Sequence, residues 1–172
     1  MKKVLIIFAL IILSGCATVG RERAVNAHMS DIGSTAVGLA LGATEMNPLG
    51  LVALVLKKIQ MDAIEAEPEA TVRAEAYGQV AAITNGAVAN NVCVAASLAV
   101  PALLPFALGG GCLAIGFGWG VHEYDENTNG EKLYDAICAE WKRDNPAFVC
   151  LPYEAAPPYV KPIVAQVEID AP

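Results

Sequence analysis

The chain is poor in aromatic residues and in basic residues. Phe, Trp and Tyr make up only 6% of its 172 residues, although 55% are hydrophobic and 15 are glycine. A soluble core of this size normally contains more large side chains, whereas closely packed helices of small residues, as in membranes, match this composition. With 11 basic and 18 acidic residues, the chain has no basic patch for nucleic acid or anionic lipid headgroups. We therefore expect no nucleic-acid partner.

Histidine is scarce as well, and this argues against metal chemistry. His28 and His122 are the only two histidines, they lie far apart in the sequence, and the cysteine spacings match no zinc site. The sequence also has no recognisable nucleophile with an accompanying base. We accordingly expect no metal site, no catalytic residues and no enzymatic activity.

The first residues of the chain have the layout of a secretion signal. Lys2 and Lys3 precede an apolar run over residues 4–12, and this run is too short for a typical spanning helix. Cleavage after residue 15 would remove two lysines and no acidic residue, leaving 9 basic and 18 acidic residues and a formal charge of −9. The mature chain would thus be strongly acidic.

The tetrapeptide Leu13-Ser14-Gly15-Cys16 resembles the lipobox of bacterial lipoproteins. In that family the cysteine receives fatty acyl chains such as palmitate and becomes the first residue of the mature chain. The resemblance implies a signal peptide over residues 1–15, no cofactor besides a covalent lipid on Cys16, and a mature chain that begins on the periplasmic side of the inner membrane. Ala17, the residue directly after the lipid site, is similar to the residue at this position in lipoproteins that are sorted to the outer membrane. An ordinary cleaved signal or an uncleaved helix is the alternative.

The remaining sequence predicts an all-α fold, a small bundle of glycine- and alanine-rich helices. Residues 16–30 are polar and predict a lipidated tether with little order. Residues 31–121 predict a hydrophobic, membrane-associated helical domain. Residues 122–151 predict an amphipathic helical segment with a disulfide, and the proline-rich residues 152–172 predict an extended tail.

Prolines divide the hydrophobic domain into helices. Residues 31–56 predict a helix with a break or kink at Pro48, and residues 59–77 predict a solvated helical connector. The next apolar block contains two further prolines, which disrupt helix interiors. This block therefore predicts an antiparallel pair of helices, over 79–100 and 105–121.

The C-terminal segment predicts an amphipathic helix over residues 130–143. Thr128 and Glu131 have the spacing of a capping box. Hydrophobic residues then recur on one helical face. These residues are Leu133, Tyr134, Ile137, Cys138 and Trp141.

Four cysteines remain once Cys16 carries lipid, and they allow three pairings. The proline turn lies midway between Cys93 and Cys112, so antiparallel helices would bring these two to the same depth. Cys138 and Cys150 would link the amphipathic helix to the segment after it, and a bridge that closes such a loop contributes about 3 kcal/mol. An oxidising envelope compartment favours both pairs.

Polar residues and glycines share one face of the first hydrophobic helix. Intervals of four and three residues stack five positions along this face. They are Asp31, Thr35, Gly38, Gly42 and Glu45. Gly38 and Gly42 form a GxxxG pattern, which favours close helix packing.

Glu45 lies inside an apolar stretch, where an ionisable group needs a partner, a proton or a wet cavity. Asn90 and Asn91 on a later helix are its candidate partners. Asn47 supports a different interpretation, in which it caps a helix that opens with Pro48 and Glu45 lies in an exposed turn. The sequence leaves both interpretations open.

Residues 31–95 resemble a family of small bacterial integral membrane proteins of unknown function. Its members share an aspartate and a threonine that open the first helix, a G-x-x-E-x-N-P segment, a later lysine and later asparagines. In this chain these positions are Asp31, Ser34-Thr35, Gly42, Glu45, Asn47-Pro48, Lys57 or Lys58, and Asn90-Asn91. The resemblance implies polar contacts between helices and no particular reaction. The chain departs from the family in its lipoprotein signal and its cysteine-containing C-terminal segment.

The cysteines constrain the topology. With Cys16 outside the inner membrane, three full spans would place Cys138 and Cys150 in the reducing cytoplasm. The predicted bridge therefore requires an even number of spans or none; otherwise both cysteines stay reduced. A bundle at the membrane without a full span also agrees with delivery to the outer membrane.

These features predict a non-enzymatic cell-envelope lipoprotein, whose helical module contacts membrane lipid and a membrane or envelope protein. A transport or ion-linked role, in which Asp31 and Glu45 exchange protons or bind cations, is the first alternative. A membrane-embedded hydrolase with these two residues as acid and base is the second. A straight helix would hold them about 21 Å apart, too far for one reaction centre.

Overall fold

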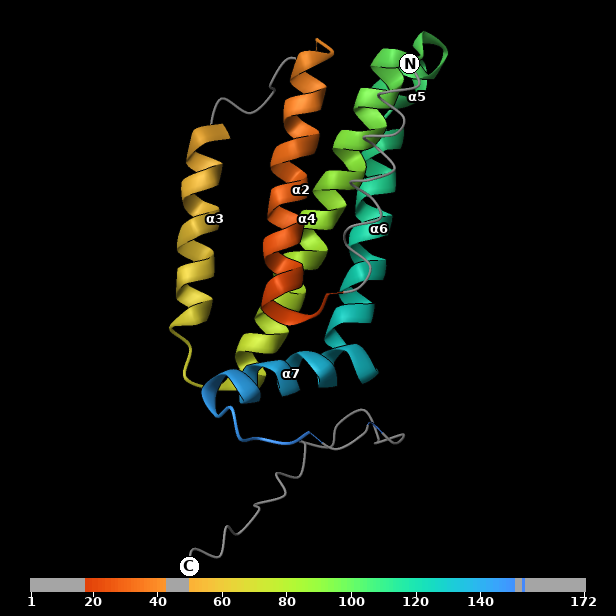
Figure 1. Cartoon of the computed structure of the whole chain (residues 1–172). Helices are drawn as coiled ribbons and strands as arrows, with labels where there is room; N and C mark the ends of the chain where they lie inside the picture. The colour runs from red at the N-terminus through yellow and green to blue at the C-terminus, as the bar shows by residue number, and fades with distance from the viewer. Residues whose placement is uncertain (1–17, 43–49, 151–152, 154–172) are drawn as a thin grey trace, which may run out of the picture.

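The computed structural model describes residues 18–42, 50–150 and 153. Among these residues it contains helices and no strand, so the predicted all-α bundle is confirmed. Figure 1 shows three long helices side by side, with a fourth beside them and a fifth across one end of the bundle. The three are α2 (Gly20–Ala40), α4 (Ala70–Ala99) and α6 (Gly111–Thr128), the fourth is α3 (Gly50–Glu65) and the fifth is α7 (Gly130–Asp144). The predicted signal peptide, Cys16 and nearly all of the predicted tail lie outside the described residues.

The predicted tether is wrong over most of its length, because α2 already begins at Gly20. Ala24 and Ala27 are buried and pack with Tyr77 and Val80 of α4. Arg23 is buried too. The charged residues of this segment suggested a solvated chain, but two alanines one turn apart provide a packing face and the arginine finds a partner inside the bundle.

The first hydrophobic segment is two helices. Helix α2 ends at Ala40, and Gly42 follows with a φ of +93°, a left-handed conformation that glycine adopts without strain. A Cβ on Gly42 would meet nothing within 4 Å, so this glycine makes no close helix contact within the described chain. The predicted break at Pro48 lies outside the described residues, and α3 begins two residues after it.

The predicted connector is also placed differently. Helix α3 continues to Glu65, and α4 begins at Ala70. The chain turns between them at Pro68, which cannot continue a helix interior. Arg73 holds this turn by donating hydrogen bonds to the backbone oxygens of Glu67 and Pro68, at 2.8 and 3.1 Å.

The helical hairpin is confirmed, but its second arm begins later than predicted. After α4 come a short 3₁₀ helix (Pro101–Leu103) and α5 (Leu104–Leu108), and α6 starts only at Gly111. The helix axis bends by 70° between α5 and α6, because Gly110 adopts a left-handed conformation with a φ of +86°. Cys93 and Cys112 lie at disulfide distance across the hairpin, with their Cα atoms 5.4 Å apart.

The amphipathic helix is confirmed almost to the residue, as α7. Asn129 occupies the N-cap position, however, and the predicted capping box does not form, because the Thr128 hydroxyl donates to the Tyr124 backbone oxygen at 2.7 Å. The apolar face of α7 packs on Ala74 of α4. Cys138 and Cys150 lie at disulfide distance, with Cα atoms 5.9 Å apart.

By length and composition alone, α4 is long and apolar enough to cross a membrane. The bent pair formed by α5 and α6, together with the turn before them, would provide a second candidate. Both belong to the hairpin. No other helix among the described residues passes the same test.

Helices α4 and α6 approach most closely at glycines. A Cβ on Gly116 would lie 2.7 Å from the Gly86 backbone oxygen, whereas one on Gly118 would meet nothing within 4 Å. We expect Gly116→Ala to lower the free energy of unfolding by about 1–3 kcal/mol, since two helix backbones must separate. Gly118→Ala is the matched control and should raise it by about 0.5–1 kcal/mol through helix propensity. Chemical denaturation followed by circular dichroism in detergent measures both, and equal effects would contradict the close approach.

Candidate functional site

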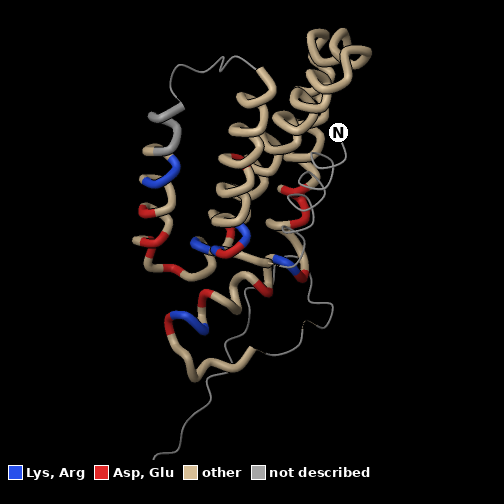
Figure 2. Tube along the Cα trace, turned by 45° about the horizontal axis from the view of Figure 1, so that its top comes forward, with Lys and Arg blue, Asp and Glu red and all other residues tan. Residues whose placement is uncertain are grey.

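One end of three described helices contains no charged residue. This end consists of residues 32–40 of α2, 86–99 of α4 and 100–122 of the turn, α5 and α6, and contains no Asp, Glu, Lys or Arg. We call this part the charge-free end. Figure 2 shows it without red or blue residues, while both colours gather where α7 crosses the bundle. That part is the charged end.

Asp31 lies at the border of the charge-free end and is the centre of a polar cluster. It forms an ion pair with Lys57 of α3. Asn91 of α4 donates to the Asp31 carboxylate at 3.0 Å and to the Thr35 hydroxyl at 3.1 Å. The Asn91 amide also lies 3.3 Å from the Ser34 hydroxyl. The structure thus brings together Asp31 and Thr35 of the predicted stripe with Asn91, which the sequence predicted as a partner of Glu45.

The other predicted positions are not all in this cluster. Asn90 packs against α6, because a Cβ on Gly116 would lie 2.8 Å from the Asn90 Cβ. Gly38 is buried on α2. Glu45 and Asn47 lie outside the described residues. Helix α2 therefore carries Asp31, Thr35 and Gly38 of the predicted stripe and ends before Gly42.

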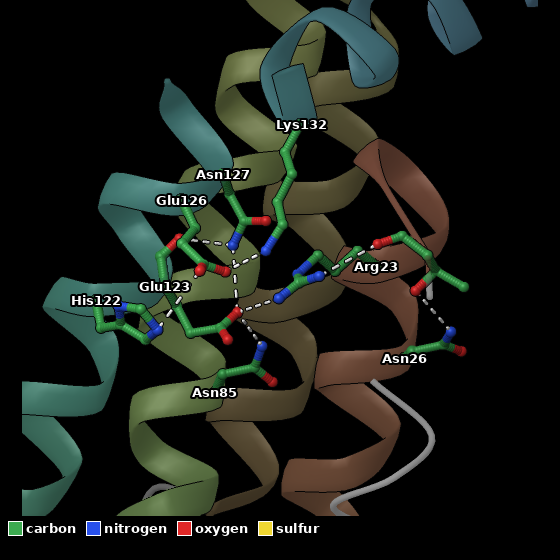
Figure 3. A network of polar contacts seen from close by, with 9 residues as sticks. Arg23, Asn26, Asn85, His122, Glu123, Glu126, Asn127 and Lys132 are labelled. Atoms are coloured by element: carbon green, nitrogen blue, oxygen red, sulfur yellow. Dashed lines mark hydrogen bonds and ion pairs between the residues drawn. The ribbon is translucent and has the colours of Figure 1, made fainter. Parts of the chain in front are cut away.

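A second cluster links three helices at the charged end (Figure 3). Glu123 of α6 accepts from Arg23 of α2 at 2.5 Å and from Asn85 of α4 at 3.1 Å. Asn127 donates to the same carboxylate at 3.2 Å. The side chains of Arg23 and Glu123 are only 7% and 9% exposed, so removal of either would leave a buried charge.

Its neighbours set the protonation of Glu123. Burial raises the pKa of this carboxyl. The hydrogen bond and charge of Arg23, together with the hydrogen bonds of Asn85 and Asn127, lower the pKa by more, so the net pKa lies below its usual value. Glu126 lies one turn further along α6 and is more exposed, and Lys132 of α7 lowers its pKa. Both acids are therefore carboxylates at neutral pH.

A third cluster attaches α7. Arg73 of α4 donates to Glu140 of α7 at 2.8 Å and also pairs with Asp144. Burial lowers the pKa of the Arg73 guanidinium, but these two carboxylates raise it by more. Arg143 adds a contact of 2.7 Å to Glu140. The hydrogen bonds of Arg73 thus join the turn before α4 to the last helix of the described chain.

The second and third clusters were not predicted. Arg23 and Glu123 are 100 residues apart in the sequence, and neither belongs to a recognisable motif. The available signal was weak: an arginine within an alanine-containing helical repeat, and a lone acid at the end of a long uncharged stretch. Such a signal indicates burial but not which residue is the partner.

Each buried or half-buried carboxylate at the centre of these clusters faces a cation from another helix. Asp31, Glu123 and Glu140 therefore act as links between helices, and their ion pairs account for their charges. Among the described residues, no group of three His, Cys, Asp or Glu side chains is arranged to hold a metal ion.

An apolar groove of about 570 Å³ runs between α4 and α6. Its wall includes Ile83, Leu113, Phe117 and Val121, and Asn90 supplies a polar group. Most of the residues that line the groove belong to the charge-free end.

The chain matches no known family model, no curated protein and no solved structure.

Lys57 should matter far more than its neighbour Lys58. Lys57 is 26% exposed and pairs with Asp31, which is 14% exposed, whereas the pair of Lys58 with Asp62 is open to solvent. We expect Lys57→Met to cost about 2 kcal/mol of unfolding free energy, because Asp31 loses its counter-charge, and to speed proteolysis within α3. Lys58→Met should change neither quantity. Chemical denaturation and limited proteolysis of the two variants measure the difference, and identical behaviour would show that the Asp31 pair does not hold α3.

The Glu123 pair should make stability depend on pH. Because the folded-state pKa lies below its usual value near 4.5, the stabilisation is complete above that value and disappears as the pH falls through the lowered one. We expect Glu123→Gln to be less stable than the parent by about 3 kcal/mol at neutral pH, and this gap to shrink in acid. Glu126→Gln, one turn away and more exposed, should show a much smaller gap. Thermal melts across this pH range measure both, and a constant gap for Glu123→Gln would contradict the pair.

Proposed function

We propose that this chain is a cell-envelope lipoprotein without enzymatic activity, whose helical bundle associates with a membrane. A lipid on Cys16 anchors it, and the bundle contacts membrane lipid and a membrane or envelope protein. The observation that carries this proposal is the separation of charge along the bundle (Figure 2). An uncharged end suits the hydrocarbon of a membrane, and a charged end suits the water beside it.

The exposed side chains support the same assignment. Leu108 is 81% exposed, Phe117 is 76% exposed and Leu113 is 68% exposed. Soluble monomers rarely expose a continuous apolar patch of large side chains, and such patches mark contacts with a protein or a membrane. Small residues at the α4–α6 contact, including Gly86 and Gly116, are also the type that packs helices inside membranes.

The cysteines support an oxidising location. Both pairs that lie at disulfide distance, Cys93 with Cys112 and Cys138 with Cys150, are the pairs expected for the periplasmic side. We propose that both are bridges in the mature protein. Ala17 favours the outer membrane as the final location of the anchored chain.

Substitution of Cys16 tests the anchor. In bacteria given labelled palmitate, the parent chain should take up label and sediment with the membranes. Cys16→Ala should take up none and keep the larger mass of the unprocessed precursor, because no acyl acceptor remains. Ser14→Ala keeps a small residue in the tetrapeptide and should be labelled normally. Gel autoradiography of the three chains measures this, and equal labelling of the parent and Cys16→Ala would refute lipidation at this residue.

A further inference from the structure

We propose that the charge-free end enters the bilayer end-on from the side that holds Cys16, and that the charged end remains at the lipid–water border. The partner of this surface is the hydrocarbon of membrane lipids. This inference rests on the proposed function and adds a direction, a depth and a topology to it.

The first argument is the exposed surface of the charge-free end. Its tip carries Leu104, Phe106 and Leu108, and its part of α6 carries Leu113, Ile115 and Phe117, all of them exposed. At about 25 cal/mol per Å² of apolar area, moving such a surface from water into hydrocarbon is strongly favourable. The described residues that make up this end, 32–40, 86–99 and 100–122, include no Asp, Glu, Lys or Arg that would oppose the transfer.

The second argument is the short distance to the anchor. Cys16 lies two residues before Thr18, the first described residue, and two extended residues span only about 7 Å. Thr18 belongs to the charged end, since its backbone oxygen accepts a hydrogen bond from Arg23 at 3.3 Å. A lipid on Cys16 therefore holds the charged end at the membrane surface. The apolar end of the bundle then leaves water only if it points into the bilayer.

The third argument is the direction of the helices. Helices α2 and α4 run toward the charge-free end, and α3 and α6 run back (Figure 1). Thr18 and α7 consequently lie at the same end of the bundle. Cys138 and Cys150 then stay on the same side of the membrane as Cys16. The fold therefore meets the condition for their pairing, which is an even number of spans or none.

The length of the helices sets the depth. From Asn85, beside Glu123, to the end of α4 at Ala99 the helix rises about 21 Å, at 1.5 Å per residue. The hydrocarbon core is about 30 Å thick. The tip therefore passes the middle of the bilayer without reaching the other surface. Asp31 and Lys57 would lie inside, and their pairing together with Asn91 makes that position tolerable. The exposed Lys58 lies next to Lys57, and its long side chain can extend toward the headgroups.

Aromatic residues mark the border that this depth implies. Trp119 and Tyr124 of α6 flank Glu123 and are 47% and 46% exposed. Trp and Tyr are enriched where membrane proteins cross from hydrocarbon to headgroups. Trp141, the other tryptophan of the chain, lies on α7 at the charged end and packs against Phe148.

These two tryptophans allow a direct test. The lipidated full chain is reconstituted into phosphatidylcholine vesicles whose acyl chains carry bromine, a fluorescence quencher, near the headgroup or near the bilayer centre. Trp141→Phe leaves Trp119 as the only probe, and Trp119→Phe leaves Trp141. Leu108→Trp in a chain that lacks both native tryptophans reports on the tip. Circular dichroism confirms that each variant is helical.

The tip probe should be quenched at least twofold more by deep bromines than by shallow ones, and Trp119 more by shallow bromines than by deep ones. Trp141 should respond to neither and be quenched by aqueous acrylamide. If the chain floats with vesicles but the tip probe responds only to acrylamide, or if Trp141 is quenched by deep bromines, end-on entry is wrong and the proposed function stands. If the chain does not float with vesicles, the proposed function itself fails. The two native probes decide the orientation even if Leu108→Trp does not fold.

Discussion

The ion pair between Arg23 and Glu123 fixes the arrangement on which the rest of the structure depends. It connects α2 with α6 across α4, and its neighbour Asn85 includes the middle helix in the same contact. Two nearly buried charges are stable only with good geometry and further hydrogen bonds, and both are present. The pair therefore sets the axial positions of three helices, and everything beyond it along those helices, except the Asp31 cluster, is uncharged.

The other two polar clusters repeat this design at different levels. Arg73 attaches α7 below the pair, and the contact of Lys57 with Asp31 attaches α3 above it. Helix α3 otherwise contributes few side chains to the core, chiefly Ile64 and Met61. Electrostatic contacts therefore determine where the peripheral helices sit, while small residues determine how closely the central ones pack. This division explains how a chain with few aromatic residues can build a defined bundle.

Local sequence signals predicted the parts of the fold that local physics controls. The spacing of hydrophobic residues located α7, the prolines located the hairpin turn, and the hairpin in turn paired Cys93 with Cys112. A polar contact of Asn91 with the first hydrophobic helix was also expected, because polar groups in apolar helices must find partners. The expected partner was Glu45, however, and the structure shows Asp31 in contact with Asn91. Long-range partners could not be predicted: Arg23 looked solvated until the fold brought Glu123 to it. The early start of α2 depends on tertiary packing, which the local sequence does not show. The late start of α6 depends on the left-handed conformation of Gly110.

The position of the Cys93–Cys112 pair has a consequence for the order of assembly. Both cysteines belong to the charge-free end, and Cys112 is almost completely buried. In the proposed orientation this end lies in hydrocarbon, where the soluble enzymes that oxidise periplasmic thiols cannot reach it. A bridge at this position would have to close while the hairpin is still in water. The hairpin would then enter the lipid as an already cross-linked unit, so that oxidative folding precedes insertion.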